Sequence, residues 1–272
     1  MKRFVIKIAF FAFITIVLLE LTSYAIRHLG WHETRVNGKE VYRAINKSKQ
    51  PGGSTVLLGD SVGNQIFSNR ECNENPNSLA CNQAVSMAGH YMLLRNYIDA
   101  GNTIDTLYYV GHPFSFQNNL DQIYTFHYFL KPFDTEAYRS LHSQAVKEQT
   151  EKIPFNFLAR SNMFSVIDWA PNYQPEVAKE YLLSPISIEY LERIKQLSEA
   201  HSFVFRLIPT PMRTSLRDSL EGLDISNYKG LSFEKEIEAY LDGIIYIDDV
   251  HFKDVQHLHN AIDYREKVLS SR

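Results

Sequence analysis

The chain has 272 residues, of which 44% are hydrophobic and 22% charged, and this composition is typical of a globular protein rather than a disordered, collagenous or polytopic membrane chain. Its 28 Lys and Arg against 31 Asp and Glu give a formal net charge of −3, and no run of five or six like charges occurs. Since nucleic-acid binders carry a basic patch, we expect no nucleic-acid partner. The length allows one catalytic-sized domain or two small ones.

The amino terminus predicts a membrane helix. Residues 4–26 are apolar apart from Lys7, Glu20 and a few hydroxyls, and they follow a Lys-Arg pair. As a helix they would span about 34 Å, enough to cross a bilayer core. A cleaved signal peptide, an uncleaved signal anchor and a buried core helix are the alternatives. Glu20 and Thr22 fit poorly in a cleavage region, so we predict a transmembrane signal anchor over residues 1–27.

The same segment indicates the compartment. Basic residues on its amino-terminal side keep that end in the cytoplasm, so everything after Arg27 is expected outside, membrane-anchored on the periplasmic or cell-surface side. Cys72 and Cys81 flank a polar segment typical of a loop. In an oxidising compartment they can form a disulfide, and two free thiols are the alternative.

Beyond a polar connector over residues 28–53, short apolar runs alternate with helical patterns, which is typical of an α/β protein. Five runs predict strands, at residues 55–58, 82–86, 106–110, 203–208 and 244–247. Helical spacing predicts helices after the first two strands and over about 188–197 and 255–268. We therefore expect one domain over residues 54–272, with a five-stranded parallel sheet.

About ninety residues separate the third and fourth predicted strands, too many for a simple crossover. They include an aromatic stretch at 124–133 and a helical pattern over 135–152. We predict a helical insertion or lid at about 117–200. The aromatic stretch is either the core of this insertion or an exposed platform for a sugar or a membrane.

The strand at 55–58 runs directly into Gly59-Asp60-Ser61 and then into a helix-compatible segment. A serine at such a turn lies at the carboxyl edge of the sheet, beside the amide donors of a helix amino terminus. The alternative is simple capping, because Asp60 or Ser61 is a good N-cap residue without any chemistry.

The other end of the chain carries Asp248-Asp249-Val250-His251 directly after the last predicted strand. A carboxylate three positions before a histidine can orient the imidazole through one ring nitrogen while the other faces a serine. His251 would take the proton of Ser61 and return it to the leaving group, and Asp248 would hold the tautomer. These residues predict a nucleophilic serine.

With these two blocks the sequence resembles the SGNH/GDSL hydrolase superfamily, whose members carry a GDS block after the first strand and a D-x-x-H block near the carboxyl terminus. The resemblance covers roughly residues 54–270. It implies a flavodoxin-like three-layer α/β/α sandwich and serine ester chemistry without a cofactor. It also implies that the oxyanion is bound by the Ser61 amide and by Gly89 in the segment SMAGH.

The third block departs from the family pattern. The family usually has G-x-N after the third strand, whereas this chain has Gly111-His112-Pro113. Asn118 or Asn119 can replace the missing donor, and exposed loop amides are the alternative. Loss of this asparagine and an amino-terminal anchor are similar to the membrane-anchored SGNH-like proteins of surface-polysaccharide O-acetylation.

Three further residues are candidate contacts to substrate: Asp60, His112 and Arg213. For Arg213 the ligand would be an acidic glycan, and a solvated side chain is the alternative. The histidines at 257 and 259 do not complete a ligand set with His251, so no metal site is expected.

The leading prediction is an SGNH/GDSL-type serine esterase or O-acyltransferase, which hydrolyses or transfers O-acyl groups through an acyl-Ser61 intermediate. The expected substrate is an envelope or extracellular glycan, and the expected acyl group is O-acetyl. Expected partners are an acylated carbohydrate or other ester, the membrane and other polysaccharide-modification proteins. The alternatives are a lipid esterase and a catalytically silent SGNH-like binding or scaffold subunit. Pro113 supports the silent subunit, whereas the set Ser61, Asp248 and His251 argues against it.

Overall fold

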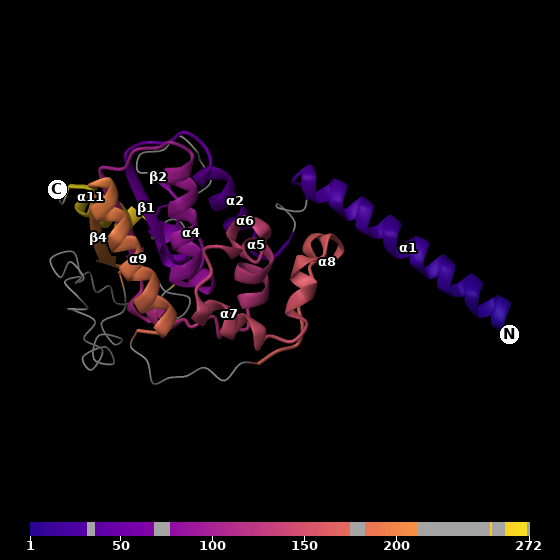
Figure 1. Cartoon of the computed structure of the whole chain (residues 1–272). Helices are drawn as coiled ribbons and strands as arrows, with labels where there is room; N and C mark the ends of the chain where they lie inside the picture. The colour runs from indigo at the N-terminus through magenta and orange to yellow at the C-terminus, as the bar shows by residue number, and fades with distance from the viewer. Residues whose placement is uncertain (32–35, 68–76, 175–182, 212–250, 252–258, 271–272) are drawn as a thin grey trace.

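A computed structural model describes residues 1–31, 36–67, 77–174, 183–211, 251 and 259–270 (Figure 1). Helix α1 (Lys2–His28) projects from the rest of the molecule, and its apolar side chains are exposed. In the part of the chain that the structure describes, α1 is the one helix long and apolar enough to cross a membrane. It is followed by α2 (Lys39–Ser48), which packs on the folded domain.

Four parallel strands form the described sheet, in the order β2-β1-β3-β4. They are β1 (Thr55–Gly59), β2 (Asn77–Ser78), β3 (Thr106–Gly111) and β4 (Val204–Pro209). The chain moves to one side of β1 to form β2 and to the other side to form β3, so the order reverses between β1 and β3. In open α/β sheets such a switch point, at the carboxyl ends of the strands, is where ligands bind.

Three of the five predicted strands are confirmed, because β1, β3 and β4 match their apolar runs. The run at 244–247 lies outside the described residues. The α/β class is therefore confirmed with four described strands in place of the five expected.

The predicted strand at 82–86 is wrong. Residues Gln83–Val85 form the short helix η1, and Ser86 begins α4 (Ser86–Asp99). The Asn82 side chain accepts a hydrogen bond from the Ala84 amide at 2.9 Å and so caps a helical turn instead of continuing a strand. The strand beside β1 comes earlier, as β2.

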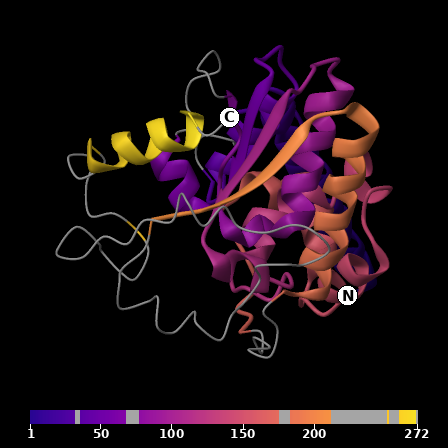
Figure 2. The same ribbon diagram turned by 90° about the vertical axis from the view of Figure 1, so that its left-hand side faces the viewer.

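Helices cover both faces of the sheet because alternate strand residues point to opposite sides. On one face α2, α4 and α9 (Pro185–His201) pack against residues such as Leu58 and Leu207. On the other, α3 (Ser61–Ile66) and α11 (His259–Ser270) pack against residues such as Leu57 and Ile208. In Figure 2 the strands lie between α11 on the left and α9 on the right. The domain therefore has three layers.

The segment between β3 and β4 that precedes α9, residues 112–184, is called the insertion here. Its described elements are η2 (Pro113–Gln117), η3 (Phe126–Leu130), α5 (Lys131–Phe133), α6 (Glu136–Arg139), α7 (Gln144–Glu151), η4 (Asn156–Arg160) and α8 (Asn162–Val166). The helix expected over 135–152 is two helices, because Ser143 caps the start of α7 by accepting from the Val146 amide. The aromatic stretch is mostly core, since Phe126, Phe129 and Phe133 are buried.

Cys81 has a free thiol, so of the two alternatives left open by the sequence the structure shows the free thiol at this residue. Its side chain is buried in the core, and burial raises the pKa of the Cys81 thiol, which therefore stays neutral. Cys72 lies outside the described residues.

Candidate active site

Ser61 and His251 meet at the carboxyl edge of β1. Ser61 is the first residue of α3, and its Oγ is 2.7 Å from Nε2 of His251. Both side chains are half-buried, so the pair is accessible from solvent. At this distance a histidine can accept the proton of a serine hydroxyl. The structure thus brings together two of the predicted site residues from positions 190 apart in the sequence.

The buried carboxylate of Asp60 accepts four hydrogen bonds. Oδ1 accepts from the amides of Val62 and Gly63, at 2.9 and 3.0 Å, and so caps α3. Oδ2 accepts from the His112 amide and the Ser115 hydroxyl, both at 2.6 Å. Asp60 therefore joins the first turn of α3 to the segment that follows β3, across the switch point. It is a positioning residue for the serine beside it.

Two glycines allow α3 to lie very close to β3. A Cβ atom added at Gly59 or at Gly63 would collide with the carbonyl oxygen of Val110. Both positions therefore require glycine. This close approach holds Ser61 at the junction between β1 and β3.

His112, a candidate substrate contact, is buried at the end of β3. Its Nδ1 accepts the Phe114 amide at 3.2 Å, so the ring proton of the neutral imidazole is on Nε2. The ring also packs against that of Phe114, with centroids 4.9 Å apart. These contacts, together with the bond from its amide to Asp60, give His112 a part in shaping the turn after β3.

Asn118 and Asn119 are buried, so the interpretation as exposed loop amides is wrong. The Asn118 Nδ2 donates to the Gln83 carbonyl, and its Oδ1 accepts from the Leu120 amide at 2.8 Å. Asn118 therefore links the segment after β3 to the segment that begins α4. One side-chain amide hydrogen of Asn118 is therefore directed to Gln83 in this structure.

Gly89, the second implied oxyanion donor, is the fourth residue of α4. Its Cα faces Val85 and Phe133, where an added Cβ would come within 2.8 and 3.1 Å of their side chains. At this position the α-helical pattern directs the Gly89 amide to the Val85 carbonyl. The role of Gly89 as a donor stays a prediction.

The start of α4 has an unusual backbone. Ser86 adopts φ 55° and ψ 178°, a conformation that is almost restricted to glycine and that occurs in proteins chiefly at functional sites. Its Oγ accepts from the Ala88 amide at 3.2 Å, and its own amide donates to Gln83. The Met87 amide lies between these two amides in the chain.

Two predicted site residues, Asp248 and Arg213, lie outside the described residues, and so does Asp249. The described residues contain no group of three His, Cys, Asp or Glu side chains that could hold a metal ion.

His90 in α4 lies at the core of the domain, edge-on to Tyr109 with ring centroids 5.2 Å apart. It is fully buried, and neither ring nitrogen has a hydrogen-bond partner among the described residues. Burial lowers the pKa of His90 to about 3, so the ring is neutral at pH 7. Burial likewise raises the pKa of the Tyr109 hydroxyl, with a contribution from the charge of Asp60.

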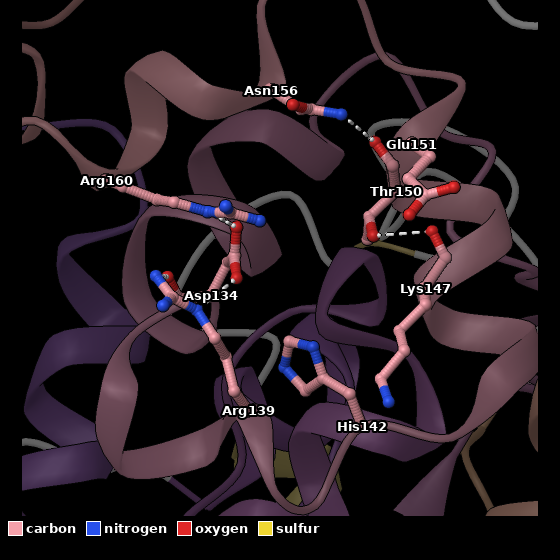
Figure 3. A pocket seen from close by; sticks show the side chains of 8 residues that line it. All are labelled: Asp134, Arg139, His142, Lys147, Thr150, Glu151, Asn156 and Arg160. Atoms are coloured by element: carbon pink, nitrogen blue, oxygen red, sulfur yellow. Dashed lines mark hydrogen bonds and ion pairs between the residues drawn. The ribbon is translucent and has the colours of Figure 1, made fainter.

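A separate pocket of about 190 Å³ opens in the insertion (Figure 3). Arg139 and Arg160 approach its wall from two sides and both bind the buried Asp134, through Nε at 3.2 and 2.8 Å. Lys147 and His142 line the pocket as well. His142 Nε2 bonds to a backbone carbonyl at 3.0 Å, and since a carbonyl only accepts, the neutral ring has its lone pair on Nδ1.

Three serines that form hydrogen bonds around the site were not predicted from the sequence: Ser86, Ser115 and Ser184. Ser184 caps α9 and its Oγ donates to the Asn118 carbonyl at 2.9 Å. Serine is common in loops, so its presence alone does not identify these contacts. The proline that follows Ser184 is the one usable signal, since Pro favours the first helical position.

No family model, no curated protein and no solved structure matches this chain. The site therefore rests on the geometry of its residues.

Proposed function

We propose that this chain is a membrane-anchored serine enzyme of the SGNH/GDSL type, which hydrolyses or transfers O-acyl groups. The observation that carries the proposal is the 2.7 Å contact between Ser61 Oγ and His251 Nε2. A nucleophile and a general base at this distance, at the carboxyl edge of a parallel sheet and beside its switch point, meet the geometric requirements of acyl transfer.

In this mechanism Ser61 Oγ attacks the ester carbonyl carbon while His251 accepts its proton. The acyl group becomes bonded to Oγ, and His251 gives the proton to the departing alkoxide, which leaves as an alcohol. Water or a second hydroxyl then attacks the acyl carbon and loses its proton to His251. The bond from that carbon to Ser61 Oγ breaks, the acyl group leaves as an acid or a new ester, and His251 returns the proton to Oγ. Asp248 is the proposed carboxylate that orients the imidazole.

We assign the oxyanion to backbone amides. Asp60 accepts the amides of Val62 and Gly63, which leaves the Ser61 amide in the first turn of α3 without a partner among the described residues. The Met87 amide, which follows the unusual backbone of Ser86, is the proposed second donor, ahead of Gly89, whose amide the helical pattern directs to the Val85 carbonyl. The Cys81 amide donates to the Gly59 carbonyl at 3.0 Å, so the chain that leads to Met87 passes beside the end of β1. Each such donor is worth about 3 kcal/mol in the transition state.

The strand order supports the family resemblance. The order β2-β1-β3-β4 equals the first four positions of the flavodoxin-like order 2-1-3-4-5, and helices lie on both faces. The run at 244–247 is the candidate for the fifth strand. The block that contains His251 would then follow the last strand, as in the family.

An anchored domain favours a substrate attached to the cell envelope, and the basic residues before α1 favour a domain outside the cytoplasm. We therefore propose O-acyl esters, O-acetyl first, on an envelope or extracellular glycan. The second candidate is a catalytically silent scaffold subunit. One observation favours it: Pro113 begins η2 and provides no N–H where the family has a donor side chain.

Hydrolysis of p-nitrophenyl acetate by the full chain in nanodiscs tests the proposal. Ser61→Ala and His251→Ala should each lower kcat/KM by about a thousandfold or more, whereas Ser198→Ala, which removes only one local bond in α9, should have no effect. Asp248→Asn should cost less than His251→Ala. Long-chain esters hydrolysed faster than acetate would favour the lipid esterase, and turnover that is absent or survives Ser61→Ala would favour the scaffold.

A further inference from the structure

A carboxylate of α1 binds the amino terminus of α8. Glu20 accepts from the Ser161 hydroxyl and from the amides of Asn162 and Met163, the latter two at 3.1 and 3.4 Å. A negative charge at a helix amino terminus is favourable because it pairs with the helix dipole and with amides that lack helical partners. Arg27, two turns further along α1, donates to the Asn162 side chain at 3.4 Å. The last two turns of α1 therefore hold α8.

This contact sets the level of the insertion relative to the membrane. The part of α1 from Lys2 to Glu20 is about 27 Å long, close to the roughly 30 Å of a hydrocarbon core. Its apolar side chains are exposed, and Figure 1 shows this part of α1 projecting beyond the rest of the molecule, with α8 beside its carboxyl-terminal end. With this part of α1 inside a bilayer, Glu20, and α8 with it, would lie at the boundary between bilayer and water.

Most of the exposed apolar side chains outside α1 belong to the insertion or to the connector that follows α1. Beyond α1, the large apolar side chains that are exposed in the described residues are Leu29, Trp31, Ile123, Tyr124, Phe155, Phe157, Ile167 and Val204. All but Val204 belong to the connector directly after α1 or to the insertion. Phe155 and Phe157 are 58% and 59% exposed; Phe155 precedes η4, the element immediately before α8, and Phe157 is its second residue. Aromatic side chains beside a membrane helix are typical of the interfacial layer.

The charge of this region complements an anionic surface. The pocket of Figure 3 is lined by three cations, Arg139, Lys147 and Arg160, and by two carboxylates, Asp134 and Glu151, which leaves one net positive charge. Arg160 directly precedes the serine that Glu20 binds, so the pocket is next to the α1 contact. Basic residues near a membrane are attracted to anionic lipids by about 1 kcal/mol each.

We propose that the insertion is a second membrane contact, in which Phe155 and Phe157 enter the interfacial layer of the bilayer and the pocket of Arg139, Lys147 and Arg160 faces anionic lipid headgroups. The contact between Glu20 and α8 fixes this surface on the side where α1 leaves the membrane. The partner is a lipid bilayer, and the inference is independent of the serine chemistry proposed above.

Photo-crosslinking of the full chain in nanodiscs tests this contact. The photoreactive residue p-benzoylphenylalanine replaces Phe157 or, as the matched control, Val204, which is 58% exposed at the start of β4. Intact mass after illumination measures the lipid adducts. We expect at least about ten times more lipid adduct at position 157 than at 204, because a Phe in the interface lies among lipid chains.

Two variants sharpen the test. Glu20→Ala should reduce the adduct at 157, because the insertion loses its attachment to α1. Lys147→Gln should reduce the preference for nanodiscs that contain anionic lipid over purely zwitterionic ones. The proposal would be overturned by equal lipid adduct at 157 and 204, or by a crosslink from 157 to a second copy of the chain in place of lipid. A yield that does not depend on lipid charge would overturn the assignment of the pocket to anionic headgroups.

Discussion

Asp60 illustrates how a side chain can control a nucleophile without touching substrate. Its carboxylate holds the first turn of α3 and the turn after β3 at the same time, with four hydrogen bonds in a buried position. Ser61 is the next residue, so its place relative to His251 depends on these bonds.

Asp60→Ala should destabilise the protein by about 3 kcal/mol, because it removes a helix cap and leaves a buried amide and hydroxyl without an acceptor. Urea unfolding measures the loss. Asp99→Ala is the control: its carboxylate is 59% exposed, forms an i,i+4 pair with Arg95, and should cost less than about 0.5 kcal/mol. Equal costs for the two variants would contradict the role given to Asp60.

His90 should make stability fall in acid. Its pKa is about 3 in the folded protein and ordinarily 6.5, so between these values the unfolded chain binds a proton that the folded chain does not. Stability therefore decreases as pH falls below about 6.5, by up to about 1.4 kcal/mol per pH unit for this residue. The free energy of unfolding, measured with urea, should be lower at pH 5 than at pH 7.5. In His90→Phe this decrease should be smaller by about 2 kcal/mol than in the parent chain. A drop of the same size in both proteins would refute this assignment.

At this scale the sequence predicted the residues with strong local signals. Ser61 follows an apolar run at a strand-to-helix turn, and His251 follows the last apolar run, so both could be placed at one edge. The proposed role of the Met87 amide could not be predicted, because it depends on the positive φ of Ser86, and a positive φ is not expected at a serine. The burial of Asn118 was also missed, since it depends on Gln83 being nearby in space.

Among elements, the packing of α3 on β3 positions the nucleophile. Gly63→Ala places a Cβ against the Val110 carbonyl, so α3 must move away from β3. We expect this variant to lose at least about tenfold in esterase activity and about 1–3 kcal/mol in stability. Gly53→Ala is the control, because nothing lies within 4 Å of an added Cβ there, and it should keep the esterase activity and the stability of the parent chain. Unchanged activity in Gly63→Ala would show that Ser61 does not depend on this approach.

Both mispredicted elements, the strand at 82–86 and the single helix over 135–152, were wrong because a side chain caps a helix within the segment. The Asn82 side chain turns an apolar run into η1, and that of Ser143 begins a new helix within a continuous helical pattern. Hydrophobic periodicity does not detect such caps. Hydrophobic periodicity did detect β1, β3 and β4, each of which contributes buried apolar residues to both faces of the sheet.

For the whole molecule, the contact between α1 and α8 restricts how the domain can move relative to α1. Glu20→Ala should speed hydrogen exchange at the amides of Asn162 and Met163 by about fivefold, the equivalent of about 1 kcal/mol for a lost cap. Hydrogen-exchange mass spectrometry of the chain in nanodiscs measures this rate. Thr22→Ala, an exposed neighbour on α1, should leave it unchanged. Identical exchange in both variants would show that α8 is not held by Glu20.

At this scale, the alternation of short apolar runs with helical patterns predicted the α/β class. The apolar segment at residues 4–26 predicted the amino-terminal helix. The attachment of α1 to the insertion could not be predicted, because Glu20 and Ser161 are 141 positions apart and neither belongs to a motif. The sequence did show Glu20 as a charge out of place in an apolar segment, and the structure gives the reason.

The central claim is that Ser61 is an activated nucleophile, and covalent labelling tests it most directly. The full chain is treated with a fluorophosphonate, which a reactive serine attacks at phosphorus with loss of fluoride, and its intact mass is measured beside that of Ser61→Ala. The account predicts a single adduct in the parent chain and none in Ser61→Ala. A folded parent chain that gains no adduct, or an adduct that persists in Ser61→Ala, would contradict it.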